Sequence, residues 1–196
     1  MGAFKEPHGG ELKQLYVDSS AIDAIKQESK DYKSWDLTDR QGCDLELILN
    51  GAFSPLEGFL SQADFDGVLK DMRLSDGTLW PMPITLDVDE AFAGSLAANE
   101  KIALRDAEGV LIATLEVSDI WTPDKEAEAV AVFGSNDMAH PAVHYLHNIA
   151  GAVYLGGKLT GVEKPTHYDF KLLREDPADV RARFEKLGWR KVVAFQ

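Results

Sequence analysis

The sequence contains a single cysteine, Cys43, and no apolar run long enough to cross a membrane. One cysteine can form neither an intramolecular disulfide nor a Cys-x-x-Cys metal pair, so a reducing compartment is expected. The opening residues, MGAFKEPHGG, lack the basic start and apolar stretch of a secretory signal, and a membrane span needs about 18 apolar residues. Glu6 also argues against N-myristoylation at Gly2. These features predict a cytoplasmic protein with no membrane segment.

Basic residues are also scarce. The chain has 20 Lys and Arg against 33 Asp and Glu, which gives a formal net charge of −13. Such a charge repels nucleic-acid phosphates and anionic membranes unless a local basic patch dominates. The densest basic group consists of Arg181, Arg183, Lys186, Arg190 and Lys191. Because an acidic residue interrupts it, we interpret it as a solvent-exposed helix face and its exit, and we expect no nucleic-acid partner.

Common catalytic motifs are missing as well: the sequence has no GxSxG, Walker or GxGxxG pattern. The segment GAFSPLEGF has glycines at Gly51 and Gly58, but Phe53 and Pro55 between them favour a tight turn that places two aromatic residues in the core. Acidic pairs occur in LDVDE, RDAEG and DKEAE, each in a predicted turn or strand end. Their pattern does not separate acid–base chemistry from solubility, so no catalytic residue is assigned.

Three histidines, His140, His144 and His147, follow one another at helical spacing. On one face of a helix, neutral imidazoles four residues apart can chelate zinc. The pattern lacks the supporting carboxylate or thiolate that most zinc sites have. The alternative is a short amphipathic helix capped by His140, with Val143 and Leu146 facing inward. We favour the helix and assign no metal site.

What the chain does contain is enough apolar material for a core: 45% hydrophobic residues, with nine Phe, four Trp and five Tyr. The apolar spacing in its first part predicts three helices. They cover residues 19–27, 44–51 and 61–72. The expected N-caps are Ser19 or Ser20, Asp44 and Ser61, and Gly51 is expected to end the second helix.

The character of the sequence then changes from helical to extended. Residues 79–88 predict a strand that two prolines confine to a sheet edge. A hairpin is predicted from strands at 101–105 and 110–120, joined by a turn at 107–109. Two further short strands are expected on either side of the Gly156-Gly157 pair. Short strands after a helical opening favour a small, partly closed β-barrel with helices packed on it.

A third pattern begins after Pro165. The segment REDPADVRARFEKLGW predicts a helix with Asp176 as N-cap, Pro177 at its first position and Gly188 at its end. The apolar run at 192–195 then indicates a buried strand of a parallel sheet. One strand cannot form a sheet, so we expect most of this second domain to lie outside the chain.

Several blocks together carry a family resemblance. They are DLELILNGAFSPLEGFLSQADFDGVLKDMRLSDGTLWPMPITLDV, NEKIALRDAEGVLIATLEVSDIW, VFGSNDMAHPAV, YLGGKLTGV, THYDF and GWRKVVAFQ, spread over residues 37–196. In this order and spacing the chain resembles the N-terminal part of the ATP sulfurylase (sulfate adenylyltransferase) family. The resemblance implies an α+β chain: a PUA-like, partly closed β-barrel with short N-terminal helices at 1–165, and the first helix and strand of a Rossmann-like nucleotidyltransferase domain at 166–196.

The resemblance also implies a reaction, in which sulfate and ATP give adenylyl sulfate and pyrophosphate, or the reverse. The family's catalytic domain opens with a strand that leads into a Gln-x-Arg-Asn-Pro motif, followed by His-x-x-His. Only the glutamine is present, as Gln196, and it would help to bind sulfate or the ATP phosphates at the end of the strand. His140, His144 and His147 precede that strand and do not match the family's histidines.

By the same resemblance, the parent protein would use Mg²⁺ with ATP as its substrate and would form a homo-oligomer. The chain alone is expected to be catalytically inactive and to support the catalytic domain. The alternative is a non-catalytic PUA-like module that binds RNA or protein. The acidic net charge and the lack of a basic, aromatic groove argue against RNA.

Overall fold

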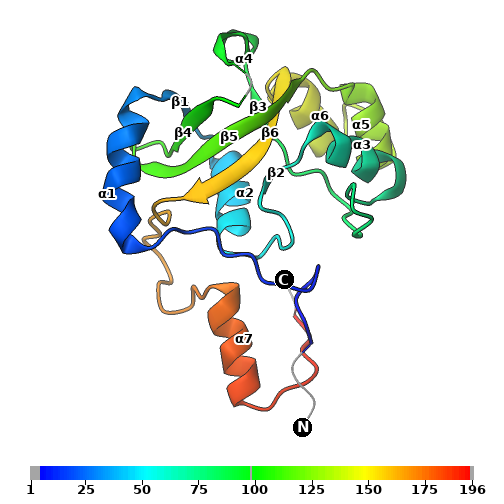
Figure 1. Cartoon of the computed structure of the whole chain (residues 1–196). Coiled ribbons are helices and arrows are strands. Elements are labelled where there is room, and N and C mark those ends of the chain that lie inside the picture. Colours follow the sequence, from blue (N-terminus) through cyan, green and yellow to red (C-terminus); the bar gives the residue numbers. More distant parts are fainter. Residues whose placement is uncertain (1–4, 98, 195–196) are drawn as a thin grey trace.

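A central sheet flanked by helices forms most of the molecule, with one further helix below it (Figure 1). The computed structural model describes residues 5–97 and 99–194. The helices are α1 (Ser19–Glu28), the 3₁₀ helix η1 (Ser29–Asp31), α2 (Asp39–Leu49), α3 (Gln62–Asp71), α4 (Glu90–Ser95), α5 (Lys125–Phe133), α6 (Pro141–Asn148) and α7 (Pro177–Lys186). The strands are β1 (Lys33–Asp36), β2 (Gly58–Phe59), β3 (Leu86–Val88), β4 (Lys101–Arg105), β5 (Leu111–Trp121) and β6 (Val153–Gly161). None of the described helices has the length and apolarity required to span a bilayer.

The strands form one mixed sheet in the order β1-β4-β5-β6-β2, and β3 pairs with β6 as well. Only β1 and β4 run parallel, while the other pairs are antiparallel. This arrangement confirms the predicted α+β class and the hairpin of β4 and β5. Among the described residues the strand pairing follows an open path, and partial closure into a barrel stays a prediction.

The Gly156-Gly157 pair lies inside one continuous strand, β6, so the prediction of two short strands there was wrong. At Gly157 a Cβ atom would come within 2.1 Å of the carbonyl oxygen of Glu116 on β5. The pairing of β5 with β6 shifts register at this point, between Val117 and Asp119. The glycines therefore allow a close backbone approach at a bulge and do not end the strand.

The predicted edge strand at 79–88 is much shorter in the structure, where only Leu86–Val88 forms β3. Pro81 and Pro83 lack the backbone N–H that a sheet ladder needs. Of the residues before β3, Leu79 makes an isolated bridge to Arg73. The prolines therefore exclude the first part of this segment from the sheet.

Two helix starts also differ from the prediction. The second helix begins five residues earlier, at Asp39, so Asp44 lies inside α2 and is not its N-cap. Thr38 is the cap: its hydroxyl accepts a hydrogen bond from the Gln41 N–H, and the Gln41 side chain accepts one from the Thr38 N–H. For α1 the N-cap position is Asp18, in place of Ser19 or Ser20. The Ser61 cap of α3 and the left-handed Gly51 after α2 are confirmed.

Replacing Thr38 by alanine tests the capping box. The variant leaves the Gln41 N–H without its acceptor, and we expect the free energy of unfolding to fall by about 1 kcal/mol. Urea denaturation of the wild type and of Thr38→Ala measures the difference. The matched control is Thr122→Ala, at an exposed position before α5. Equal stability of the two variants would contradict the role given to Thr38.

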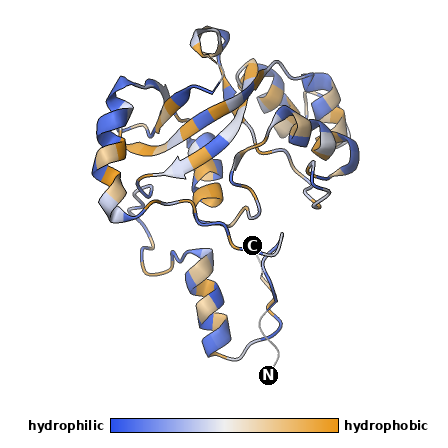
Figure 2. Ribbon diagram, viewed as in Figure 1, coloured by the Kyte–Doolittle hydropathy of each residue, from blue (hydrophilic) through white to orange (hydrophobic). Residues whose placement is uncertain are grey.

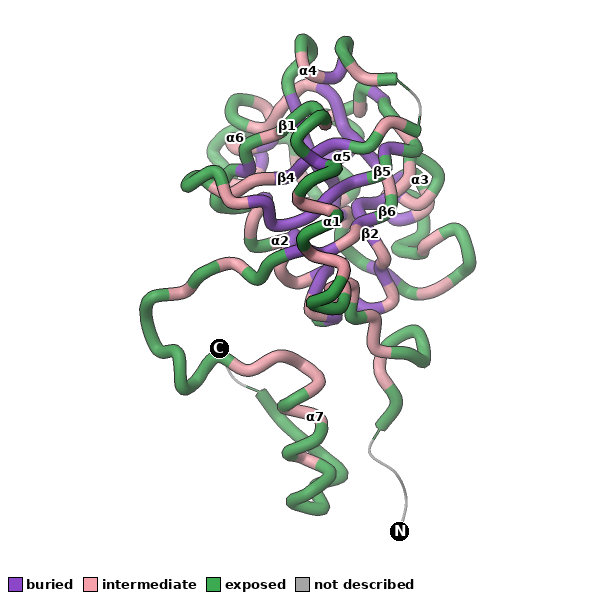
Figure 3. The backbone as a smooth tube through the Cα atoms, turned by 60° about the vertical axis from the view of Figure 1, so that its left-hand side comes forward, coloured by how far each residue is buried: buried purple, intermediate pink, exposed green. Residues whose placement is uncertain are grey.

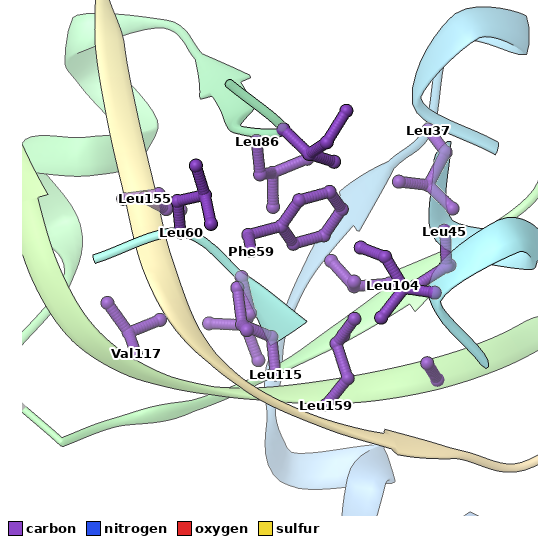
Figure 4. Packing of buried hydrophobic residues seen from close by; sticks show 14 of the residues in the cluster. Leu37, Leu45, Phe59, Leu60, Leu86, Leu104, Leu115, Val117, Leu155 and Leu159 are labelled. Atoms are coloured by element: carbon purple, nitrogen blue, oxygen red, sulfur yellow. The ribbon is translucent and has the colours of Figure 1, made fainter. Parts of the chain in front are cut away.

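The main hydrophobic core is centred on Phe59, which is 3% exposed. Its ring lies among leucines of the sheet and of α2 (Figure 4). The labelled neighbours include Leu60, Leu86, Leu104, Leu115, Leu155 and Leu159. Phe53 is partly buried and packs against the same core. The prediction that GAFSPLEGF places two aromatic residues in the core is therefore confirmed.

The helix after residue 165 has the predicted ends: Asp176 at the N-cap position, Pro177 in the first turn and a left-handed Gly188 after its last turn. The strand predicted after it is not formed by the described residues 192–194. Val193 is largely exposed, and no parallel neighbour pairs with this segment among the described residues. The remaining predicted strand residue, Phe195, lies outside the described residues.

Candidate functional site

Two of the acidic runs each place one carboxylate in the interior. Asp87, from LDVDE, lies on β3 and is 5% exposed, and Glu128, from DKEAE, lies on α5 and is 7% exposed. The run RDAEG stays in the turn between β4 and β5. Neither buried carboxylate was predicted from the sequence, since a charged residue beside other charged residues is usually exposed.

Asp87 is surrounded by hydrogen-bond donors from two separate parts of the chain. Its Oδ1 accepts a bond from Gln41 Nε2 at 3.0 Å and lies 3.4 Å from Arg40 Nη2, both on α2. Its Oδ2 accepts a bond from the Gly151 N–H at 2.7 Å, just before β6. Arg40 also pairs with Asp44 at 3.0 Å. These donors satisfy an ionised Asp87 and connect α2, β3 and the start of β6.

Glu128 has a poorer set of donors. The Tyr154 hydroxyl, on β6, donates to Glu128 Oε2 at 2.9 Å. Burial raises the pKa of Glu128 to about 7, against the opposing effects of the Tyr154 hydrogen bond and the cations Lys125 and Arg40. Burial also raises the pKa of Tyr154, and the neighbouring carboxylate adds to that increase. Glu128 can therefore gain or lose a proton near neutral pH, while Tyr154 keeps its own.

Lys125 holds α5 to the end of α6. Its Nζ donates to the carbonyl oxygens of Leu146 at 2.8 Å and of Ala150 at 2.9 Å. Carbonyls at a helix C-terminus lack intrahelical partners, so a lysine ammonium is a suitable donor there. Burial lowers the pKa of Lys125. Hydrogen bonds or charge interactions link a set of residues that we call the polar cluster: Arg40, Gln41, Asp44, Asp87, Lys125, Glu128, Tyr145 and Tyr154.

Two cavities of the described structure are lined by residues other than Asp87 and Glu128. One of about 420 Å³ is lined by Glu57, Asp64 and Lys158, among others. Another, of about 270 Å³, lies between α2 and the segment after residue 164, where His167 Nε2 is 2.8 Å from Glu46 Oε1. Neither Asp87 nor Glu128 lines either of these cavities, and the hydrogen bonds of the polar cluster connect elements of the fold.

The three histidines do not come together as a ligand set. His140 caps α6, with its Nδ1 accepting a bond from the Ala142 N–H at 3.3 Å, and His147 Nε2 lies 2.6 Å from Asn136 Oδ1. Val143 and Leu146 are buried, so the amphipathic-helix interpretation is confirmed. In the part of the chain that the structure describes, no group of three or more His, Cys, Asp or Glu residues is placed to hold a metal ion.

The C-terminal segment exposes an unusual number of large apolar side chains. They are Tyr168, Phe170, Leu172, Leu173, Leu187, Trp189, Val192 and Val193. Leu172 is 96% exposed. Figure 2 shows hydrophobic stretches on α7, below the sheet. Figure 3 shows α7 and the chain beside it as exposed or intermediate, and none of the described residues after Val162 is buried. This segment therefore carries apolar surface that the described chain does not cover.

Gln196, the one residue assigned to a substrate site by resemblance, lies outside the described residues. Two arginines of the basic group on α7 are engaged in contacts: Arg183 pairs with Glu175, just before the helix, and Arg181 donates to the carbonyl of Lys5, near the start of the chain. These contacts fit a solvated helix face, as the sequence predicted.

Comparison with known proteins gives consistent matches. Residues 5–164 match the family described as PUA-like domain. The chain is 52% identical over 194 residues to a sulfate adenylyltransferase of Mycosarcoma maydis, covering 97% of this chain and 34% of that protein. A sulfate adenylyltransferase of Saccharomyces cerevisiae is 49% identical, with 97% and 38% covered. The chain thus spans about a third of the length of these curated relatives.

A solved structure also resembles the chain. It is described as a hexameric APS kinase from Thiobacillus denitrificans, with a TM-score of 0.75 and 35% sequence identity. The match covers 95% of this chain and 32% of that one. The fold seen here therefore recurs as one part of a much longer protein.

Proposed function

The chain belongs to the PUA-like domain family, and we propose that it is the N-terminal part of a sulfate adenylyltransferase. The observation that carries the proposal is the 52% identity over nearly the whole chain to an enzyme of that name. Such an enzyme would join sulfate to the α-phosphate of ATP, with release of pyrophosphate, or run in reverse. MgATP would enter as substrate, with its metal held by the phosphates and not by the described residues.

We assign residues 1–165 to a supporting PUA-like domain, with a partly closed barrel, and residues 166–196 to the beginning of a Rossmann-like catalytic domain. The exposed apolar side chains from Tyr168 to Val193 support this division. A segment with this much uncovered apolar surface is expected to pack against further protein. In the complete enzyme, α7 and the run after it would be covered by the parallel sheet to which that run contributes a strand.

Within this proposal, Gln196 is the substrate-binding residue of the chain. Two anions must be brought together in the reaction, so the site needs hydrogen-bond donors and positive charge. A glutamine amide can supply a donor to sulfate or to the phosphates of ATP. We assign no catalytic residue to the rest of the chain. We further propose a homo-oligomeric, cytoplasmic parent protein.

A pyrophosphate-release assay tests the proposal directly. With ATP and either sulfate or molybdate, we expect no turnover by the 196-residue chain and measurable turnover by the protein encoded by the complete gene. The physical reason is that the anion-binding arginines and histidines that the resemblance implies have no match in this chain. Turnover by the chain alone would overturn the assignment of the active site. Inactivity of the complete protein would overturn the assignment of the enzyme.

A further inference from the structure

The α5–α6 pair is attached to the sheet through a few buried polar contacts. The two helices lie at one end of the sheet, beside α3 (Figure 1). Glu128 bonds to Tyr154 on β6, and the Gly151 N–H, just after α6, bonds to Asp87 on β3. Lys125 ties the two helices together through the carbonyls of α6. We propose that the Glu128–Tyr154 contact is a proton-controlled latch, which holds α5–α6 on the sheet while Glu128 is neutral and loosens it when Glu128 ionises.

The contrast between the two buried carboxylates supports this role. Asp87 receives bonds from Gln41 and Gly151 and lies beside Arg40, so its negative charge is compensated where it is buried. Glu128 is almost as buried, yet within the described residues its carboxyl has a single hydrogen-bond donor, the Tyr154 hydroxyl. One neutral hydroxyl does not replace the water that an ionised carboxylate loses on burial.

The charged groups that face Glu128 do not remove this cost. Lys125 and Arg40 favour its ionised form, and Asp87 opposes it. The ammonium of Lys125 is already bonded to two carbonyls, and Arg40 is already paired with Asp44 and Asp87. The other elements near Glu128, which are α6, α3 and β5, contribute aromatic side chains.

On those elements, α6 places Tyr145 against Arg40, and α3 and β5 place Phe65 and Trp121 against the Tyr154 ring. Phe65 and Trp121 carry no charge that could stabilise an ionised Glu128. The balance therefore leaves a carboxyl that is neutral in mildly acidic solution and ionised in mildly basic solution.

The pH window follows from the direction of the shift. The pKa of Glu128 is about 7 in the folded protein, above its ordinary value of 4.5. A carboxyl whose folded pKa is raised binds more protons in the folded state than in the open state between these two values. Its contribution to closure is complete below pH 4.5 and is lost as the pH rises to about 7. The small apolar cluster of Ala129, Val143 and Leu146 lies between the two helices, so α5 and α6 are expected to loosen together.

Hydrogen exchange of the full-length protein, read by mass spectrometry on peptides from residues 125–148, tests the latch. After correction for the intrinsic pH dependence of exchange, we expect the opening of these peptides to increase roughly 30-fold between pH 5.5 and 8.5. Peptides from β5 serve as the internal reference and should not follow this change. The readout is independent of catalysis, so it does not depend on the proposed enzyme.

Three variants complete the experiment. Glu128→Gln keeps the shape without the charge and should flatten the pH profile, while the matched control Glu126→Gln, exposed on the same helix, should leave it unchanged. Tyr154→Phe removes the hydroxyl that donates to Glu128 and should move the midpoint of the profile to higher pH. The wild-type profile can be measured even if a variant fails to fold. A flat wild-type profile, or an unchanged slope in Glu128→Gln, would overturn the proposal.

Discussion

Replacing Asp87 by alanine is expected to lower the free energy of unfolding by about 3–5 kcal/mol. The side chain accepts hydrogen bonds from the Gln41 amide and the Gly151 N–H and lies beside the Arg40 guanidinium. Truncation would leave the Gly151 N–H without its acceptor and Arg40 without one of its two carboxylates. Because these donors come from separate parts of the chain, the loss affects α2, β3 and the connection between α6 and β6 together. Urea denaturation, followed by circular dichroism, measures it.

The control for Asp87→Ala is Asp23→Ala, which removes the same charge from an exposed position on α1. We expect its free energy of unfolding to stay within about 0.5 kcal/mol of the wild type. Asp87→Asn should fall between the two, since an amide oxygen can still accept from Gly151 but carries no charge for Arg40. If Asp87→Ala were as stable as Asp23→Ala, the polar cluster would have no part in holding these elements together.

In the complete enzyme, replacing Gln196 by alanine is expected to lower kcat/KM about 100-fold or more. The expectation rests on the proposed function, in which the glutamine amide donates a hydrogen bond to sulfate or to the phosphates of ATP. In a site with little water, a hydrogen-bond donor stabilises negative charge on the substrate or in the transition state more strongly than the same donor would at the protein surface. Gln196→Glu should be at least as damaging, because it replaces the donor with a negative charge of the same shape. Steady-state pyrophosphate release measures both variants.

Gln62→Ala, at an exposed position in the first turn of α3, is the control for Gln196→Ala. It should keep the activity of the wild type. Thermal unfolding of each variant separates a lost contact with substrate from a lost fold. If Gln196→Ala kept wild-type activity, the assignment of Gln196 to the substrate site would be wrong. The proposed role of this chain would then be limited to supporting the catalytic domain.

The exposed apolar segment and the buried polar cluster lie in different parts of the chain. Tyr168, Leu172 and Trp189 belong to the part that we assign to a second domain, and their exposure reflects packing that needs further protein. The polar cluster lies within the PUA-like part, among α2, β3, α5 and β6. The proposed proton latch would therefore act on the supporting domain and not directly on the substrates.

Local signals in the sequence predicted much of the secondary structure. The turn glycines and alternating strands identified the hairpin of β4 and β5, and the caps at Ser61, His140 and Asp176 placed three helix starts. The start of α2 was missed although its signal was present, since Thr38 and Gln41 have capping-box spacing. The errors at β3 and β6 concerned prolines and glycines, whose effect depends on what lies opposite them in the sheet.

What the sequence determined by itself is the membership of a family and the class of the fold. Hydrophobic periodicity and capping are local properties, and ordered sequence blocks persist among relatives, so both can be read without coordinates. Only the tertiary structure decided that two acidic runs contribute Asp87 and Glu128 to the interior, with different partners. Hydrogen bonds in the interior join residues that are far apart in the chain, such as Gln41 and Asp87, or Glu128 and Tyr154. No local sequence pattern indicates which of these distant residues meet. The protonation of Glu128 depends on these neighbours, because the same side chain in water would be ionised at neutral pH.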